Sequence, residues 1–170
     1  MLSFDIRSLE SRAAQVGGQL EPDDPVWEAR DMRPSKPIQV EGRLSAAGAS
    51  RFYFSGSFRG EAGMPCRRCL TDVTVHVTEE AHLIFSSEGE DSLDDPDVYP
   101  FDPNAHFLDL RPAIREVWLL AAPGFMQCRD DCRGLCATCG TDLNTGSCDC
   151  VPVAAESRWN ALLPIRDELS

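Results

Sequence analysis

The stretch CRDDCRGLCATCGTDLNTGSCDC, residues 128–150, holds six of the eight cysteines of this 170-residue chain. Its strongest local pattern is Cys136-x-x-Cys139-Gly140. Two cysteines at this spacing direct both sulfurs to one point, and the glycine permits the turn that this requires. Cys148-x-Cys150 follows and completes a set of four thiol groups. The spacing is typical of a structural metal site.

Cys66 and Cys69 form a separate C-x-x-C in the middle of the chain. We expect them to share a second site with Cys128 and Cys132, so that two zinc ions each have four sulfur ligands. A single zinc with spare thiols beside it is the alternative, and iron also binds four thiolates. Because both proposed sites are closed by protein ligands, the pattern predicts a structural role for the metal rather than a catalytic one.

A disulfide framework is the competing interpretation of eight cysteines, and it is typical of small secreted domains. The N-terminal residues MLSFDIRSLE lack the apolar core of a signal peptide. No apolar run approaches the length of a membrane span. We therefore expect a cytoplasmic protein that does not bind a membrane and whose cysteines bind zinc.

The chain is acidic, with 28 Asp and Glu against 16 Lys and Arg and a formal net charge of -12. Nucleic-acid binding requires clustered positive charge, so the overall composition favours a basic protein as partner. Four arginines nevertheless adjoin the cysteines of the second site, and they are candidate RNA contacts: Arg67, Arg68, Arg129 and Arg133. The alternative is that these arginines only offset the thiolate charge.

Alternating apolar residues predict three strands over residues 38–44, 52–58 and 73–85. Because they follow one another closely, we expect an antiparallel meander, and the first C-x-x-C lies at the connection between its last two strands. A brief strand is also predicted over residues 107–110. The fold class predicted is α+β, with one or two helices packed on the sheet and a C-terminal zinc-knuckle segment.

Two helices are indicated by apolar residues at helical spacing. The first is expected over residues 9–16, ending at Gly17-Gly18, and the second over residues 111–122, with Pro112 in its first turn. Between them, the proline-rich stretch 20–37 predicts a connector that Trp27 anchors to the core.

Three segments are expected along the chain: an α+β body over 1–125, a cysteine-rich metal-binding segment over 126–150 and a tail over 151–170. Within the body, residues 79–109 contain no Lys or Arg and many acidic residues. Such a one-signed run predicts a solvated loop, or alternatively a contact surface for a basic partner. A short helix is expected within the tail, around Trp159.

No pattern predicts an enzyme or a small-molecule substrate. Pro65-Cys66-x-x-Cys69 matches half of the zinc-deaminase signature, but the upstream H-x-E is missing because His76 is the first histidine. His76, His82 and His106 are expected to be ordinary surface residues. The sequence also lacks a glycine-rich phosphate loop and a G-x-S-x-G motif.

Several motifs together resemble the bacterial YceD family, the large ribosomal RNA subunit accumulation proteins. They are the C-x-x-C after a Phe-rich strand, FLDLRPAIREVWLLAAP at 107–123, GLCATCGTDLN at 134–144 and SRWNAL at 157–162. The resemblance implies a non-catalytic cytoplasmic factor that supports accumulation, processing or assembly of large-subunit ribosomal RNA, and binds ribosomal protein or precursor RNA. The alternative function is a redox-sensitive zinc-binding chaperone, because oxidants can open such thiolate sites.

Overall fold

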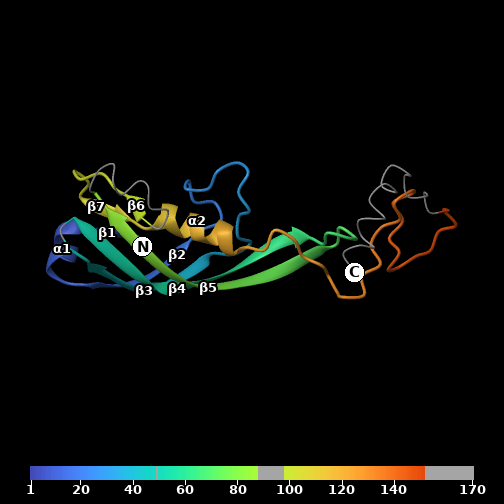
Figure 1. Cartoon of the computed structure of the whole chain (residues 1–170), viewed down its shortest axis with the longest axis horizontal. Helices are drawn as coiled ribbons and strands as arrows, with labels where there is room; N and C mark the ends of the chain where they lie inside the picture. The colour runs from blue at the N-terminus through green and yellow to red at the C-terminus, as the bar shows by residue number, and fades with distance from the viewer. Residues whose placement is uncertain (49, 88–97, 152–170) are drawn as a thin grey trace, which may run out of the picture.

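A five-stranded sheet forms the body of the protein, in the order β2 (Ala14–Leu20), β3 (Ile38–Ala46), β4 (Arg51–Pro65), β5 (Asp72–Ser86) and β6 (Val98–Pro100). A separate pair joins β1 (Ser3–Asp5) to β7 (Phe107–Asp109). The computed structural model describes residues 1–48, 50–87 and 98–151 (Figure 1). The helices are α1 (Ile6–Ser11) and α2 (Arg111–Ala121).

The predicted meander is confirmed and has a fourth strand, because β2, β3, β4 and β5 pair antiparallel in sequence order. The short β6 pairs parallel to β5, so the sheet is mixed at this edge. Along β3, Ile38, Val40 and Leu44 are buried while Gln39 and Glu41 are exposed. This alternation leaves one face of the sheet for the core and the other for solvent.

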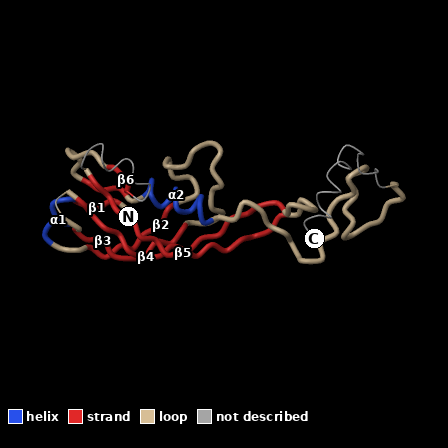
Figure 2. The backbone as a smooth tube through the Cα atoms, viewed as in Figure 1, coloured by secondary structure: helices blue, strands red, loops and turns tan. Residues whose placement is uncertain are grey.

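Strands β4 and β5 form a long hairpin that carries the first C-x-x-C at its turn. Each strand has 15 residues, and their register runs without interruption from Arg51 opposite Ser86 to Pro65 opposite Asp72. The hairpin extends beyond the rest of the sheet and reaches the cysteine-rich segment (Figures 1 and 2). A continuous pair of hydrogen-bonded strands therefore connects the body to the cysteines.

Helix α2 covers the inner face of the sheet through Trp118, whose side chain is fully buried. Its indole ring lies 6.3 Å from the ring of Phe58, and its Nε1 donates a hydrogen bond of 2.8 Å to the carbonyl oxygen of Met32. Met32 lies in the connector between β2 and β3, where Trp27 is also buried, as predicted. The connector and α2 thus share one core.

The helix predicted over residues 9–16 was wrong at both ends, because α1 begins at Ile6 and ends at Ser11. Helix α1 ends at Ser11, and β2 begins at Ala14, so Gly17 and Gly18 lie inside an edge strand instead of ending a helix. The cap is Asp5, whose side chain accepts a hydrogen bond from the backbone of Ser8. Pairing of β2 along β3 overrides the weak helical periodicity of this stretch.

The acidic run of residues 79–109 was predicted as a loop, although its two ends overlap the strands predicted over 73–85 and 107–110. The structure has strands at both ends. Residues 79–86 belong to β5, and the short strands β6 and β7 lie in the later part of the run. The brief strand predicted over 107–110 is confirmed by β7. Residues 88–97 lie outside the described residues, as does the helix predicted in the tail. The exposed face of β5 accommodates acidic side chains, which explains why their charge does not prevent a strand.

Helices α1 and α2 have 6 and 11 residues. In the described part of the chain, no helix has the length and apolar character needed to cross a membrane.

A substitution at Gly60 in β4 tests how tightly α2 packs on the sheet. A Cβ atom at this position would lie 2.6 Å from the Trp118 ring, whereas a Cβ at Gly63 in the same strand would meet nothing within 4 Å. We therefore expect Gly60→Ala to lower the free energy of unfolding by about 1–3 kcal/mol through overpacking. Urea denaturation measures this, with Gly63→Ala as the matched control. Equal stability of the two variants would contradict the packing described.

Candidate metal centre

The first cluster brings together sulfurs that are distant in the sequence. Cys66 and Cys69 lie at the β4–β5 turn, and Cys128 and Cys132 lie after α2. The Sγ atoms of Cys66 and Cys132 are 3.9 Å apart, and those of Cys69 and Cys128 are 3.6 Å apart. A parallel bridge between Cys66 and Met126 positions the second segment alongside the hairpin turn.

The second cluster lies within the cysteine-rich segment and comprises Cys136, Cys139, Cys148 and Cys150. Its residues are half-buried or exposed, whereas three of the four cysteines in the first cluster are buried. All eight cysteines are free thiols. The structure thus groups the sulfurs in the same two sets that their spacing predicts, and metal binding by these sets stays a prediction.

The two C-x-x-C turns have the same backbone geometry. In the first, Cys66 donates its N–H to the carbonyl of Thr71, and Leu70 donates to the carbonyl of Cys66, at 2.8 and 2.9 Å. In the second, Cys136 donates to Thr141 and Gly140 donates to Cys136, at the same two distances. The residue after the second cysteine has positive φ in both turns, 60° at Leu70 and 75° at Gly140. Both turns therefore have the same geometry, and we call them the first and second knuckle.

Each knuckle also directs donors at its sulfurs. Backbone N–H groups of Arg68 and Cys128 donate to Cys66 Sγ, each at 3.4 Å, and the Arg68 bond is the main reason that the pKa of Cys66 falls to about 6. Cys139 has its pKa lowered to about 6, chiefly by its hydrogen bond with the Thr141 hydroxyl. These bonds favour thiolates, the form that binds metal, at Cys66 and Cys139. Burial raises the pKa of Cys128 to about 12, and the hydrogen bond with Cys139 raises the pKa of Cys150 to about 12.

The sulfur positions fit a zinc ion. Zinc–sulfur bonds of about 2.3 Å in a tetrahedron place neighbouring sulfurs about 3.8 Å apart. The distances of 3.9 and 3.6 Å in the first cluster agree with that spacing, and within each cluster all four sulfurs lie within 4.8 Å of one another. Both sets could hold a metal ion such as zinc through sulfur ligands alone.

The four arginines predicted as RNA contacts are all exposed and adjoin the first cluster. Two of them are engaged by neighbours, because Arg67 donates to Gln127 and Arg129 pairs with Asp131 at 3.1 Å. Within the described residues, the guanidinium groups of Arg68 and Arg133 have no partner. The structure does not test whether any of them contacts RNA.

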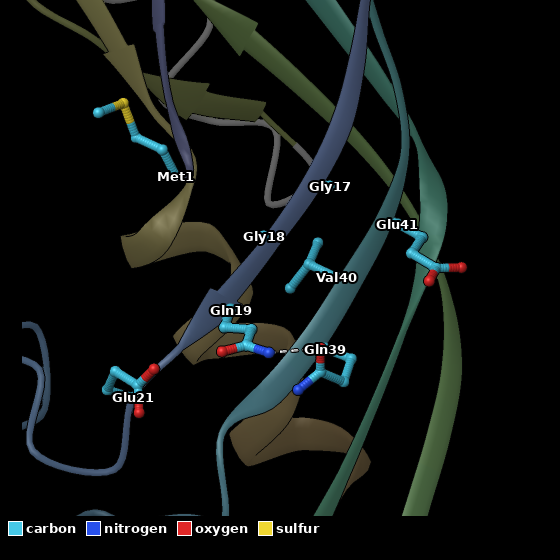
Figure 3. A pocket seen from close by; sticks show the side chains of 8 residues that line it. All are labelled: Met1, Gly17, Gly18, Gln19, Glu21, Gln39, Val40 and Glu41. Carbon is cyan, nitrogen blue, oxygen red and sulfur yellow. Dashed lines mark hydrogen bonds between the residues drawn. The ribbon is translucent and has the colours of Figure 1, made fainter.

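Other features lie away from the cysteines. A hollow over β2 and β3 is lined by backbone at Gly17 and Gly18 and by polar side chains, among which Gln19 donates to Gln39 at 3.0 Å (Figure 3). No cysteine or histidine lines this hollow. His76 lies near Glu61 at 3.7 Å, and His82 bonds to the Tyr53 hydroxyl, both on the solvent-facing side of the sheet.

Three functional details escaped the sequence analysis. Thr71 and Thr141 occupy matching places, and the repeated pattern C-x-x-C-x-T could have revealed them. No sequence pattern indicated the positive φ of Leu70, because leucine does not favour that conformation. The side chain of Asn144 donates to Cys132 Sγ at 3.6 Å, a contact between loops that spacing alone does not predict.

Comparison with known proteins identifies relatives. A family described as "Large ribosomal RNA subunit accumulation protein YceD" matches residues 54–165. The chain is similar to proteins named large ribosomal RNA subunit accumulation protein YCED homolog 1, chloroplastic, from Zea mays and Arabidopsis thaliana. The maize protein is 34% identical over 73 residues, and the Arabidopsis protein is 24% identical over 99% of this chain. These alignments cover 25% and 58% of the relatives' own lengths. No solved structure gives a significant match.

Gly140 allows the second knuckle to be tested without altering a ligand. Its φ is 75°, and a Cβ atom there would meet nothing within 4 Å, so Gly140→Ala changes backbone strain alone. A left-handed conformation costs a residue with a side chain about 1–2 kcal/mol. We expect a roughly tenfold weaker zinc affinity at the second cluster, measured by chelator competition. Gly124→Ala, which also has free space but no positive φ, is the control. An unchanged affinity would show that the turn does not limit binding.

Proposed function

Because this chain belongs to the YceD family of large ribosomal RNA subunit accumulation proteins, we propose that it supports accumulation, processing or assembly of large-subunit ribosomal RNA. It does so as a non-catalytic factor in the cytoplasm. The arrangement of the cysteines supports this role, since both clusters have four protein sulfurs and neither offers an evident position for substrate.

Zinc at both clusters is part of the proposal. Four sulfurs of the first cluster would hold one ion and connect the β4–β5 turn to the segment after α2, while those of the second would hold another. Bound zinc supplies structural cross-links here and no reaction chemistry. The cysteine-rich segment then acts as a rigid tip at the end of the long hairpin, and this tip is the surface we propose for docking.

The partners proposed are a basic ribosomal protein, large-subunit precursor RNA, or both. The net charge of -12 favours a basic protein on the body. RNA contact is proposed at the tip, where Arg67, Arg68, Arg129 and Arg133 are exposed. Arginine binds phosphate and stacks on unpaired bases, so Arg68 and Arg133, whose guanidinium groups have no partner among the described residues, are best placed for such contacts.

Cells that lack the protein provide the test of the general role. We expect their ratio of large- to small-subunit ribosomal RNA to fall, and expression of the intact chain to restore it. Cys66→Ser with Cys69→Ser should fail to restore the ratio, because the first cluster then loses two of its four sulfurs. Northern blots of both RNAs, with immunoblots to check protein level, measure this. A normal ratio in cells without the protein would contradict the proposed function.

The RNA contact is tested by reversing the charge at Arg68 and Arg133. Arg68→Glu with Arg133→Glu should weaken crosslinking to precursor RNA about tenfold or more, since each substitution replaces a phosphate-binding group with a repelling one. Arg12→Glu with Arg43→Glu makes the same charge change at exposed residues of the body and is the matched control. Equal crosslinking by the two double variants would exclude a specific RNA contact at the tip.

A further inference from the structure

Asn144 belongs to the loop of one cluster but contacts a cysteine of the other. In the sequence it lies between Cys139 and Cys148, so it is part of the loop that the second cluster closes. Its Nδ2 lies 3.6 Å from Cys132 Sγ in the first cluster and donates to that sulfur. One side chain therefore joins the two candidate metal centres.

Three further hydrogen bonds fix the orientation of the Asn144 side-chain amide, and a fourth holds its backbone. Its Oδ1 accepts from the backbone N–H of Arg133 at 2.8 Å and from Arg129 Nη2 at 2.9 Å. Its Nδ2 and its backbone N–H both donate to Asp142 Oδ1, at 2.7 and 2.9 Å. Since donors surround the oxygen and acceptors face the nitrogen, the amide cannot rotate without losing bonds on both sides.

Backbone contacts bind the same loop to the first knuckle. Leu135 donates its N–H to the carbonyl of Arg68, and Leu143 donates to the carbonyl of Gly134, each at 2.9 Å. A Cβ atom on Gly134 would lie 2.9 Å from the Arg68 carbonyl oxygen, and φ at this glycine is 74°. The connection between the clusters is thus short, close-packed and hydrogen-bonded to both knuckles.

We propose that Asn144 is a positioning residue that couples metal binding at the two clusters. Metal at the second cluster orders the loop, and the ordered loop places the amide donor on the sulfur of Cys132. That hydrogen bond stabilises the negative charge of a thiolate ligand and fixes its direction, so the first cluster binds metal more tightly when the second is loaded. By linkage, the first cluster strengthens the second equally. The inference rests on the proposed binding of zinc at both clusters.

The coupling is tested by adding zinc to the full metal-free chain and counting bound ions by native mass spectrometry. At half saturation, we expect chains with no zinc and with two zincs to dominate. In Asn144→Ala, chains with a single zinc should accumulate, because the contact that joins the clusters is lost. Ser147→Ala changes an exposed residue of the same loop and should behave as the intact chain does.

A second measurement separates positioning from a general effect on folding. Cys148→Ser with Cys150→Ser removes two ligands of the second cluster but keeps Asn144. This variant should bind zinc at the first cluster roughly 10–100-fold more weakly, the usual effect of losing a partner of a metal ligand. Asn144→Ala in the same background should add little, because the loop no longer places the amide. Cobalt in place of zinc gives a spectroscopic check, since the thiolate-to-metal absorption should shift in Asn144→Ala.

The possible outcomes are distinct. Full additivity of the cysteine and asparagine substitutions, or independent loading of two zincs by the intact chain, would overturn the coupling and leave the proposed zinc sites intact. A chain that binds no metal at either cluster would overturn the zinc sites themselves, and with them the coupling.

Discussion

Closure of the first cysteine cluster is the constraint on which the arrangement of the molecule depends. Cys66 and Cys132 are 66 residues apart, and closing a flexible loop of that length costs about 4 kcal/mol of chain entropy. Structural zinc binding contributes roughly 10–16 kcal/mol in small zinc-finger peptides, which exceeds that cost. The body also reduces the cost, because α2 packs on the sheet through Trp118 and brings the following segment to the hairpin turn. Core packing and the proposed zinc ion would thus favour the same connection.

The parts of the fold that could be predicted from sequence are those in which local pattern and tertiary packing agree. Strands β3, β4 and β5 have alternating apolar residues, and their inner side chains meet the core. Helix α2 begins at Arg111, with Pro112 in its first turn, and buries the apolar face that its spacing indicates. The N-terminal stretch was misjudged because its glycines were taken as a helix end. Gly18 instead lies where a Cβ atom would meet the backbone of Met1 at 3.1 Å, a close approach that only the folded chain reveals.

The candidate centre was predictable to the extent that its chemistry is local. Two C-x-x-C pairs indicate two knuckles. Four sulfurs for each site assign Cys148 and Cys150 to the second knuckle, which leaves Cys128 and Cys132 for the first. The features of the centre that could not be predicted from the sequence depend on contacts between distant segments. Leu70 adopts the positive φ that Gly140 adopts without strain, so the first knuckle is held in that conformation by its sheet and its sulfur neighbours. Asn144 gives no signal in sequence because its role depends on where Cys132 lies in space.

The two clusters differ in burial, so the tip has an inner part next to the hairpin and an outer part exposed to solvent. The first cluster is joined to the hairpin and mostly buried, whereas the second has Cys139 exposed and is connected to the first knuckle by the hydrogen bond from Leu135 to Arg68. Zinc in the first cluster would therefore stabilise the connection to the body, and zinc in the second would shape the outer surface. A partner that binds the outer surface contacts a unit whose position is set, through the Leu135–Arg68 hydrogen bond, by the hairpin. Because that hairpin is continuous with the central strands, the tip can be rigid without any catalytic group, as a docking element requires.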